Sequence, residues 1–212
     1  MSLVFYDFPM APSPRRARIA LLEKGVSFQT VIVDLMANEH LSESFRQISP
    51  TCTVPALRLP DGAVLTENNG IAAYLEAAYP EPPLLGTTPR EKGEVAMWTA
   101  RVEFCGLMAV AEALRNGNPA MKDRAITGPT NYPQIPELSA RGLARFREFL
   151  DMLEAHLPGR DFIVGDRLSV ADIAGVVAVD FARVIQIKPD PEQHANLIRW
   201  RKGLHARPSF SR

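Results

Sequence analysis

Two hydroxyl side chains near the N-terminus are candidates for catalysis. Ser13 stands between two prolines in "APSPRRARIALLEKG", Ala11 to Gly25, and Tyr6 lies in the apolar run before it. At the start of a helix, a hydroxyl can donate a hydrogen bond to an anion, and the unpaired backbone N–H groups favour the same charge. The structural alternative is that Ser13 caps a helix that begins at Pro14. Both functions are compatible in one residue.

A second candidate site is the dipeptide Val54-Pro55, which precedes a predicted strand. A proline at the start of a strand cannot donate to the ladder of the sheet. If the bond before it is cis, the backbone N–H and C=O of Val54 turn outward and can pair with an extended, peptide-like ligand. An ordinary proline at a strand start is the alternative, and spacing alone favours it because cis bonds are a small minority.

The third candidate site is "TENNG", Thr66 to Gly70, between a strand and a helix. Glu67 and Asn68 lie where the first N–H groups of that helix are unpaired, so a carboxylate could bind to the N–H and amide side. Glu67 could accept hydrogen bonds from an ammonium group of the same ligand. The alternative is that Asn68 only caps the helix.

Composition narrows the class of protein. The chain has 212 residues, 46% of them hydrophobic, with 24 basic and 24 acidic side chains. A zero net charge gives no field that would concentrate nucleic acid, and no apolar run is long enough to span a bilayer. Cys52 and Cys105 form no C-x-x-C pair and no metal-ligand spacing, which indicates buried thiols in a reducing compartment. We therefore expect a cytoplasmic protein that binds a small molecule and holds no metal.

The first part of the chain predicts a small α/β domain with a mixed sheet, over residues 1–80. "SLVFYDF" and "FQTVIVDL" are strand-like and flank a helix that ends at Gly25, which makes a βαβ unit. A short helix over "ESFRQIS" follows, and then "VPALRLP" and "AVLT" form an antiparallel hairpin. A helix begins after Glu67. The proline-rich residues 81–89 suit a linker.

Residues 90–212 predict an all-helical domain. Two long amphipathic helices, over "EKGEVAMWTARVEFCGLMAVAEALRN" and "ELSARGLARFREFLDMLEAHL", flank a loop rich in proline and glycine. "SVADIAGVVAVDFARVI" is apolar all round, which is typical of a helix inside a bundle. Ser169 and Asp172 form a capping box at its start, with Leu168 and Ile173 as a hydrophobic staple. A closing helix over "NLIRWRKGLHAR" is ended by Pro208.

In this order the motifs resemble the cytosolic glutathione S-transferases over essentially the whole chain. The features that carry the resemblance are "VPAL", the proline-rich linker and "LSVADI", and the segment from "VDLMANEHL" to "AAYPE" is similar almost end to end. The resemblance implies a thioredoxin-like N-terminal domain with a mixed four-stranded sheet, followed by a helical bundle. It also implies glutathione as co-substrate, a small electrophile as second substrate, and a homodimer, with no nucleic acid or membrane as partner.

The resemblance implies functions for individual residues. Val54, held by a cis Pro55, should pair with the cysteinyl part of glutathione, while Glu67 and Asn68 should hold the γ-glutamyl end. Asn68 departs from the family, which usually has serine or threonine there, but its amide can still donate to a carboxylate. The full set of expected glutathione contacts is His40, Thr53, Val54, Pro55, Glu67 and Asn68, with Cys52 as a neighbour.

We predict the group that activates the glutathione thiol by comparing positions of this chain with the catalytic positions of the family it resembles. Ala11 falls where many relatives have a catalytic serine, and Ser13 matches the threonine of an "A-P-T-P" turn in bacterial members of a related class. We rank Ser13 first, Tyr6 second, and backbone N–H groups alone third. The cluster Arg15, Arg16 and Arg18 could add positive potential near the sulfur. The expected acceptor pocket comprises Ala11, Trp98, Arg101, Val102 and Met108, near Met97 and Cys105, and the helical members could equally be bundle core or dimer contacts.

Several functions are compatible with these residues. The leading one is a glutathione transferase that makes a thiolate for attack on a small electrophile. Its relatives are a glutathione-dependent disulfide or peroxide reductase, and a dehalogenase or isomerase that uses glutathione as a cofactor. A binding protein without catalysis is the remaining alternative, suggested by Ala11 and Asn68.

Overall fold

A computed structural model describes residues 2–211 of the chain, which divide into two compact units. The first unit comprises the chain up to Leu84 together with Thr127–Thr130, and the second comprises Leu85–Ile126 and the chain from Asn131 onward. Within the described residues, no helix is long and apolar enough to cross a membrane.

The first unit is built on a mixed four-stranded sheet with the strand order β2-β1-β3-β4. β1 pairs in parallel with β2 and antiparallel with β3, and β3 pairs antiparallel with β4 across the turn at Pro60-Asp61-Gly62. Phe5 sits opposite Thr30 on one side and Leu57 on the other, so β1 is a central strand. The strands are Leu3–Asp7, Phe28–Ile32, Ala56–Arg58 and Val64–Thr66. The predicted βαβ unit and hairpin are confirmed.

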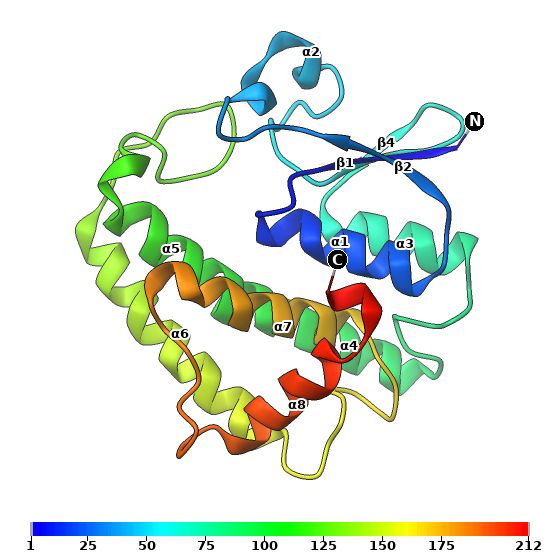
Figure 1. The fold of residues 1–212 in the computed structure, drawn as a ribbon, viewed down its shortest axis with the longest axis vertical. Coiled ribbons are helices and arrows are strands. Elements are labelled where there is room, and N and C mark those ends of the chain that lie inside the picture. Colours follow the sequence, from blue (N-terminus) through cyan, green and yellow to red (C-terminus); the bar gives the residue numbers. More distant parts are fainter. Residues whose placement is uncertain (1, 212) are drawn as a thin grey trace. The chain divides into compact units, whose positions relative to one another are not determined.

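Helices cover both faces of this sheet (Figure 1). α1, Pro12–Glu23, and α3, Asn68–Ala78, pack against each other on one face, and the short α2, Glu43–Arg46, lies on the other. Because successive side chains of a strand point to opposite faces, β1 contributes to two separate cores. Val4 and Tyr6 join Phe45 of α2 in one cluster, while the Phe5 ring packs edge-on against Phe28.

The second unit is helical, as predicted. In residues 85–126 and 131–211 the structure has no strand beyond one isolated bridge, between Arg124 and Tyr132. The predicted first long helix contains a feature that its pattern did not indicate: α4 and α5 are joined by a π-helix, Val102–Leu107. The last helix ends at His205, before the predicted stop at Pro208. The α-helices are α4 Pro89–Arg101, α5 Met108–Gly117, α6 Pro136–His156, α7 Val170–Phe181 and α8 Ala195–His205.

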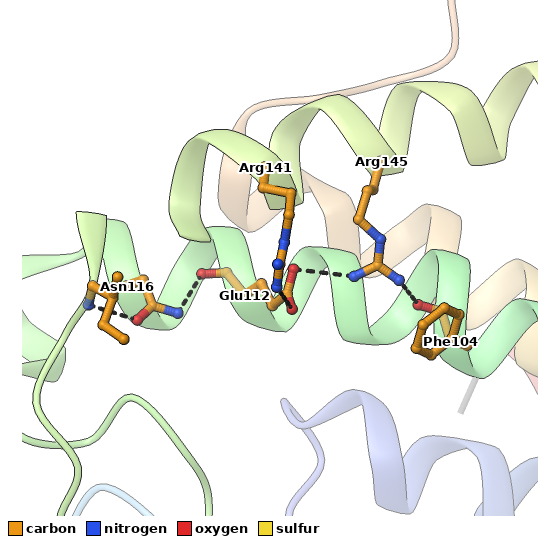
Figure 2. Close-up of polar contacts among 6 residues, drawn as sticks. Phe104, Glu112, Asn116, Arg141 and Arg145 are labelled. Atoms are coloured by element: carbon orange, nitrogen blue, oxygen red, sulfur yellow. Dashed lines mark hydrogen bonds and ion pairs between the residues drawn. The ribbon is translucent and has the colours of Figure 1, made fainter. Parts of the chain in front are cut away.

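α5 and α6 make the most extensive helix–helix contact of this unit. Figure 2 shows Glu112 of α5 between Arg141 and Arg145 of α6, with nitrogen–oxygen distances of 2.8 and 3.1 Å. Arg145 also donates to the backbone oxygen of Phe104 in the π-helix, at 2.6 Å, and lies over the Phe104 ring. Gly142 permits this approach, because a Cβ there would stand 2.6 Å from the carbonyl oxygen of Ala109.

α7 begins at a buried polar network around Asp172. Its carboxylate accepts hydrogen bonds from the N–H and hydroxyl of Ser169, from the N–H of Ile163 and from the indole of Trp200 in α8. Asp172 therefore does more than the predicted capping: it ties three segments together. Leu168 and Ile173, the predicted staple, are both buried. Burial raises the pKa of Asp172 to about 6 against the pull of these donors.

Candidate active site

The N-termini of α1 and α3 meet through two side chains that are 55 residues apart in sequence. Asn68 Nδ2 donates to Ser13 Oγ at 2.9 Å, and both side chains are half-buried. Because the serine oxygen is the acceptor in this bond, its own proton is available to a further acceptor. Asn68 Oδ1 is buried and has no hydrogen-bond partner among the described residues. An N–H or ammonium donor on a ligand would satisfy it.

The start of α1 differs from the prediction. The helix begins at Pro12 after Ala11 as N-cap, so Ser13 is the second helical residue and the predicted helix start at Pro14 is wrong. Pro12 and Pro14 have no backbone N–H, and the N–H of Arg15 already donates to the Ala11 carbonyl. Of the first three residues of this helix, Ser13 is therefore the one that has a backbone N–H, in addition to its hydroxyl.

α3 begins at a residue with unusual backbone geometry. Glu67 is its N-cap, with φ 63° and ψ 133°, and its exposed side chain makes no capping bond. Positive φ in a residue other than glycine costs on the order of 1–3 kcal/mol and is concentrated at functional sites. Asn68 is the first helical residue, so the alternative in which Asn68 is only the N-cap is excluded. The Glu67 carboxylate remains available to a ligand.

The segment before β3 holds Val54 and Pro55 in place. The Val54–Pro55 peptide bond is cis, as the resemblance implies, and Val54 lies outside the ladder that begins at Ala56. Ser49, fully buried, donates from its hydroxyl to the Thr53 carbonyl at 3.0 Å. The Thr53 and Thr51 hydroxyls are 2.8 Å apart.

The remaining candidates of the first unit have different environments. His40 is half-buried in the 3-10 turn Glu39–Leu41, between β2 and α2. Cys52 is a buried free thiol with φ 54°. Tyr6 is 5% exposed, and its ring packs edge-on against Phe45, with centroids 6.1 Å apart. Tyr6 thus faces the α2 side of the sheet, whereas Ser13 belongs to the helix that covers the opposite face.

A buried ion pair that the sequence did not reveal fixes the turn between β1 and α1. Asp7, the last residue of β1, pairs with Arg18 of α1, and Arg18 also donates to the Pro9 carbonyl. Asp7 Oδ1 and Arg18 Nε are buried without a partner in the described part of the chain. Arg18 is therefore the ion-pair partner of Asp7, and its charge is not available to add positive potential near the sulfur as predicted from the sequence. The available signals were an acid that ends an apolar strand and an arginine in the helix that follows.

The residues of the helical unit that were predicted to line the acceptor pocket do not all line the same cavity. Trp98 and Arg101 line a cavity of about 280 Å³ between α4 and the segment after α6. Val102 is completely buried, like a bundle-core residue, and Met108 is exposed. Cys105 is a half-buried free thiol. Ala11 belongs to the other unit.

Two family models match the chain. Residues 11–78 match the model described as glutathione S-transferase, N-terminal domain, and residues 124–208 match glutathione S-transferase, C-terminal domain. Glutathione S-transferase 2 of Saccharomyces cerevisiae is 32% identical over 213 residues, which cover 99% of this chain and 88% of that protein.

Solved structures agree in fold. A glutathione S-transferase domain-containing protein from Marinobacter aquaeolei VT8 has a TM-score of 0.87 at 32% identity, with 98% of this chain and 99% of that chain covered. The beta-etherase LigF from Sphingobium sp. strain SYK-6 has a TM-score of 0.83 at 26% identity, with 100% and 98% covered. The expected fold, a thioredoxin-like domain followed by a helical one, is confirmed. Relatives with this fold carry different activities in their names.

Proposed function

The chain belongs to the glutathione S-transferase family, and from this premise we propose that it activates the thiol of glutathione as a thiolate for attack on a small electrophile. The observation that supports this proposal is the hydrogen bond from Asn68 Nδ2 to Ser13 Oγ, 2.9 Å long. Because the Ser13 oxygen accepts the hydrogen bond from Asn68, the Ser13 O–H is left to donate to the glutathione sulfur. A free thiol has a pKa near 8.5, and each unit of depression corresponds to about 1.4 kcal/mol, which one charge-assisted hydrogen bond supplies.

Ser13 is the preferred activating residue for two further reasons. The prolines at positions 12 and 14 remove two of the N–H groups with which a bare helix N-terminus would hold an anion. A mechanism that uses only backbone N–H groups is therefore left with the N–H of Ser13. Tyr6 is engaged in core packing on the α2 face of the sheet.

We assign the parts of glutathione to the polar groups of the first unit. The backbone of Val54, before the cis bond, pairs with the cysteinyl residue, with Thr53 and Pro55 beside it. The α-ammonium group of the γ-glutamyl end donates to the buried Asn68 Oδ1 and to Glu67. His40 lies toward the glycine carboxylate.

The test compares wild type with Ser13→Ala, using a chlorinated dinitrobenzene as electrophile. We expect kcat to fall by 10-fold to 100-fold and the pKa of the bound glutathione thiol, followed by the thiolate absorption, to rise by about one unit. KM for glutathione should change little, since the hydroxyl acts on the thiolate. Ser27→Ala, which alters an exposed serine of the same unit, is the matched control.

An unchanged rate and an unchanged thiol pKa in Ser13→Ala would refute the assignment of Ser13. The same variants should also be assayed with a small glutathionyl disulfide, since a thiolate attacks a disulfide as well. Turnover there without turnover of the electrophile would favour a reductase. Binding to immobilised glutathione without either activity would favour a protein that only binds glutathione.

A further inference from the structure

The tip of the loop between α5 and α6 is part of the first unit. Although the chain on either side of it belongs to the helical unit, Thr127–Thr130 groups with the chain up to Leu84. Gly128 is buried between exposed neighbours, and a Cβ added to it would stand 3.5 Å from the Thr51 carbonyl oxygen. The tip therefore packs on the segment that leads to the cis peptide bond before Pro55.

The base of this loop is closed by hydrogen bonds. The backbone N–H of Ala125 donates to the Tyr132 carbonyl at 3.2 Å. Arg124 Nη1 donates to Asn131 Oδ1 at 3.1 Å, and Arg115 of α5 donates to the Arg124 carbonyl at 2.8 Å. Because both sides of the loop are tied together and to α5, the tip has less conformational freedom than a loop of the same length without these bonds.

The backbone is restricted both in the tip and in the segment below it. Gly128 has φ 116°, a conformation that a residue with a side chain adopts only under strain, and Pro129 fixes the φ of the next position. In the segment below, Cys52 has φ 54°, and the hydroxyls of Ser49 and Thr51 are 3.1 Å apart. Two restricted segments therefore lie against each other at this point.

The position of the tip is important for the direction in which an extended ligand lies. The proposed function assigns the γ-glutamyl end of glutathione to Glu67 and Asn68, and its cysteinyl backbone to Val54. The glycyl end of an extended tripeptide then lies beyond Val54, on the side away from Asn68. The chain from Thr51 to Val54 spans at most about 11 Å, so a tip that packs on Thr51 stands within reach of the glycyl end.

We propose that Thr127–Thr130 determines thiol specificity by closing the site at the glycyl end of glutathione. It admits the terminal glycine and excludes γ-glutamylcysteinyl peptides that extend beyond it. This inference rests on the proposed function for the place of glutathione, but it concerns which thiol is accepted and not how the thiol is activated. The selectivity is therefore independent of the Ser13 hydroxyl.

The test compares glutathione with γ-glutamylcysteinylglycylglycine, which is one glycine longer and keeps the terminal carboxylate. With the full chain and a chlorinated dinitrobenzene as electrophile, we expect kcat/KM of wild type to favour glutathione at least 20-fold. Gly128→Ala strains the tip at φ 116° and should lower this preference at least fivefold, mainly because the longer peptide reacts faster. Gly62→Ala in the turn between β3 and β4, at φ 92° with no atom within 4 Å of the added Cβ, is the matched control and should keep the preference.

A second variant and a binding measurement separate this proposal from the proposed reaction. Pro129→Gly loosens the exposed tip without adding a side chain, and it should lower the preference about twofold even if Gly128→Ala does not fold. Calorimetric titration with the S-hexyl derivatives of both peptides measures selectivity without turnover, and Ser13→Ala should show the selectivity of wild type.

Two results would overturn the proposal: equal affinity of wild type for the two derivatives, or unchanged selectivity in the correctly folded variants of Gly128 and Pro129. If wild type discriminates between the derivatives but turns over neither thiol, the proposal is supported and only the proposed transferase reaction fails.

Discussion

At the scale of single residues, the proposed glutathione site is argued from the hydrogen bond between Asn68 and Ser13. Neither side chain is distinctive alone, since a serine between prolines and an asparagine after a strand are common at helix starts. Together they place a hydroxyl, the backbone N–H of Ser13 and an amide oxygen without a partner among the described residues within one small region. A site for an anionic sulfur and a neighbouring ammonium group needs this combination.

Asn68→Ala should therefore affect both binding and activation. We expect KM for glutathione to rise about 10-fold, since one truncated charge-assisted contact costs about 1.5–3 kcal/mol and water replaces part of it. The thiol pKa should rise less than in Ser13→Ala, because the hydroxyl remains. Asn68→Ser, which restores the residue type usual in the family, should recover part of the loss. Steady-state kinetics test this prediction, with Asn69→Ala at the exposed neighbouring residue as the control. Kinetic constants like those of wild type in Asn68→Ala would contradict it.

Tyr6→Phe tests whether the Tyr6 hydroxyl, rather than that of Ser13, activates the thiol. The ring contacts with Phe45 survive this change, and the hydroxyl lies on the face of the sheet away from α1. We expect kcat/KM within about twofold of wild type and an unchanged thiol pKa. A loss as large as that of Ser13→Ala would move the activating function to Tyr6.

At the scale of elements, the start of α7 should make stability depend on pH. The pKa of Asp172 is about 6 in the folded chain, against an ordinary value of 3.8 for an aspartate, because burial disfavours its charge. Between these values the folded chain holds a proton that the unfolded chain has lost. The contribution of Asp172 to the free energy of unfolding is thus complete below about pH 4, falls as the pH rises to about 6, and is constant above that. The total loss over this range is about 3 kcal/mol.

Asp172→Asn removes this titration and isolates it from other groups. The amide should destabilise the fold at every pH, because its NH₂ faces the N–H of Ser169 or of Ile163, which are both donors. The difference in unfolding free energy between wild type and variant should be larger at pH 4 than at pH 7. Urea denaturation across this range measures it, and a difference that grows with pH would show that the pKa is lowered instead.

The close contact of α5 with α6 gives a second prediction for elements. A Cβ at Gly142 would meet backbone atoms of α5 at 2.6 and 2.7 Å, which cannot move aside like a flexible side chain. Gly142→Ala should cost about 2–4 kcal/mol of unfolding free energy. Gly93→Ala in α4, where no atom lies within 4 Å of the added Cβ, should instead gain up to about 1 kcal/mol. Thermal denaturation of both variants tests the pair, and equal melting temperatures would contradict it.

At the scale of the whole molecule, we expect a homodimer that covers an exposed apolar stripe. Met97, Phe104 and Met108 follow one another at helical spacing from α4 through the π-helix to α5, and all three are exposed. Such a stripe is typical of an interface in a family expected to dimerise. Light scattering should give twice the chain mass for wild type and a shift toward the monomer for Phe104→Glu. Val184→Glu, an exposed apolar residue off the stripe, should stay dimeric, and a monomeric wild type would refute the expectation.

The sequence by itself determined the elements of this protein and their order. Strand alternation, helical periodicity, prolines and the capping box are local signals, because each depends on neighbours along the chain. They gave the mixed sheet, the helical unit and the Val54–Pro55 and Ser13 candidates. The start of α1 was misplaced by two residues, since a serine between prolines suits either position.

Only the tertiary structure decided which of these residues work together. Asn68 reaches Ser13 across 55 residues, Asp7 selects Arg18 from three nearby arginines, and Arg160 joins Trp98 and Arg101 around one cavity. The π-helix between α4 and α5 likewise had no sequence signal. The physical reason is that contacts between distant segments depend on how helices and strands pack, and local patterns do not contain that information.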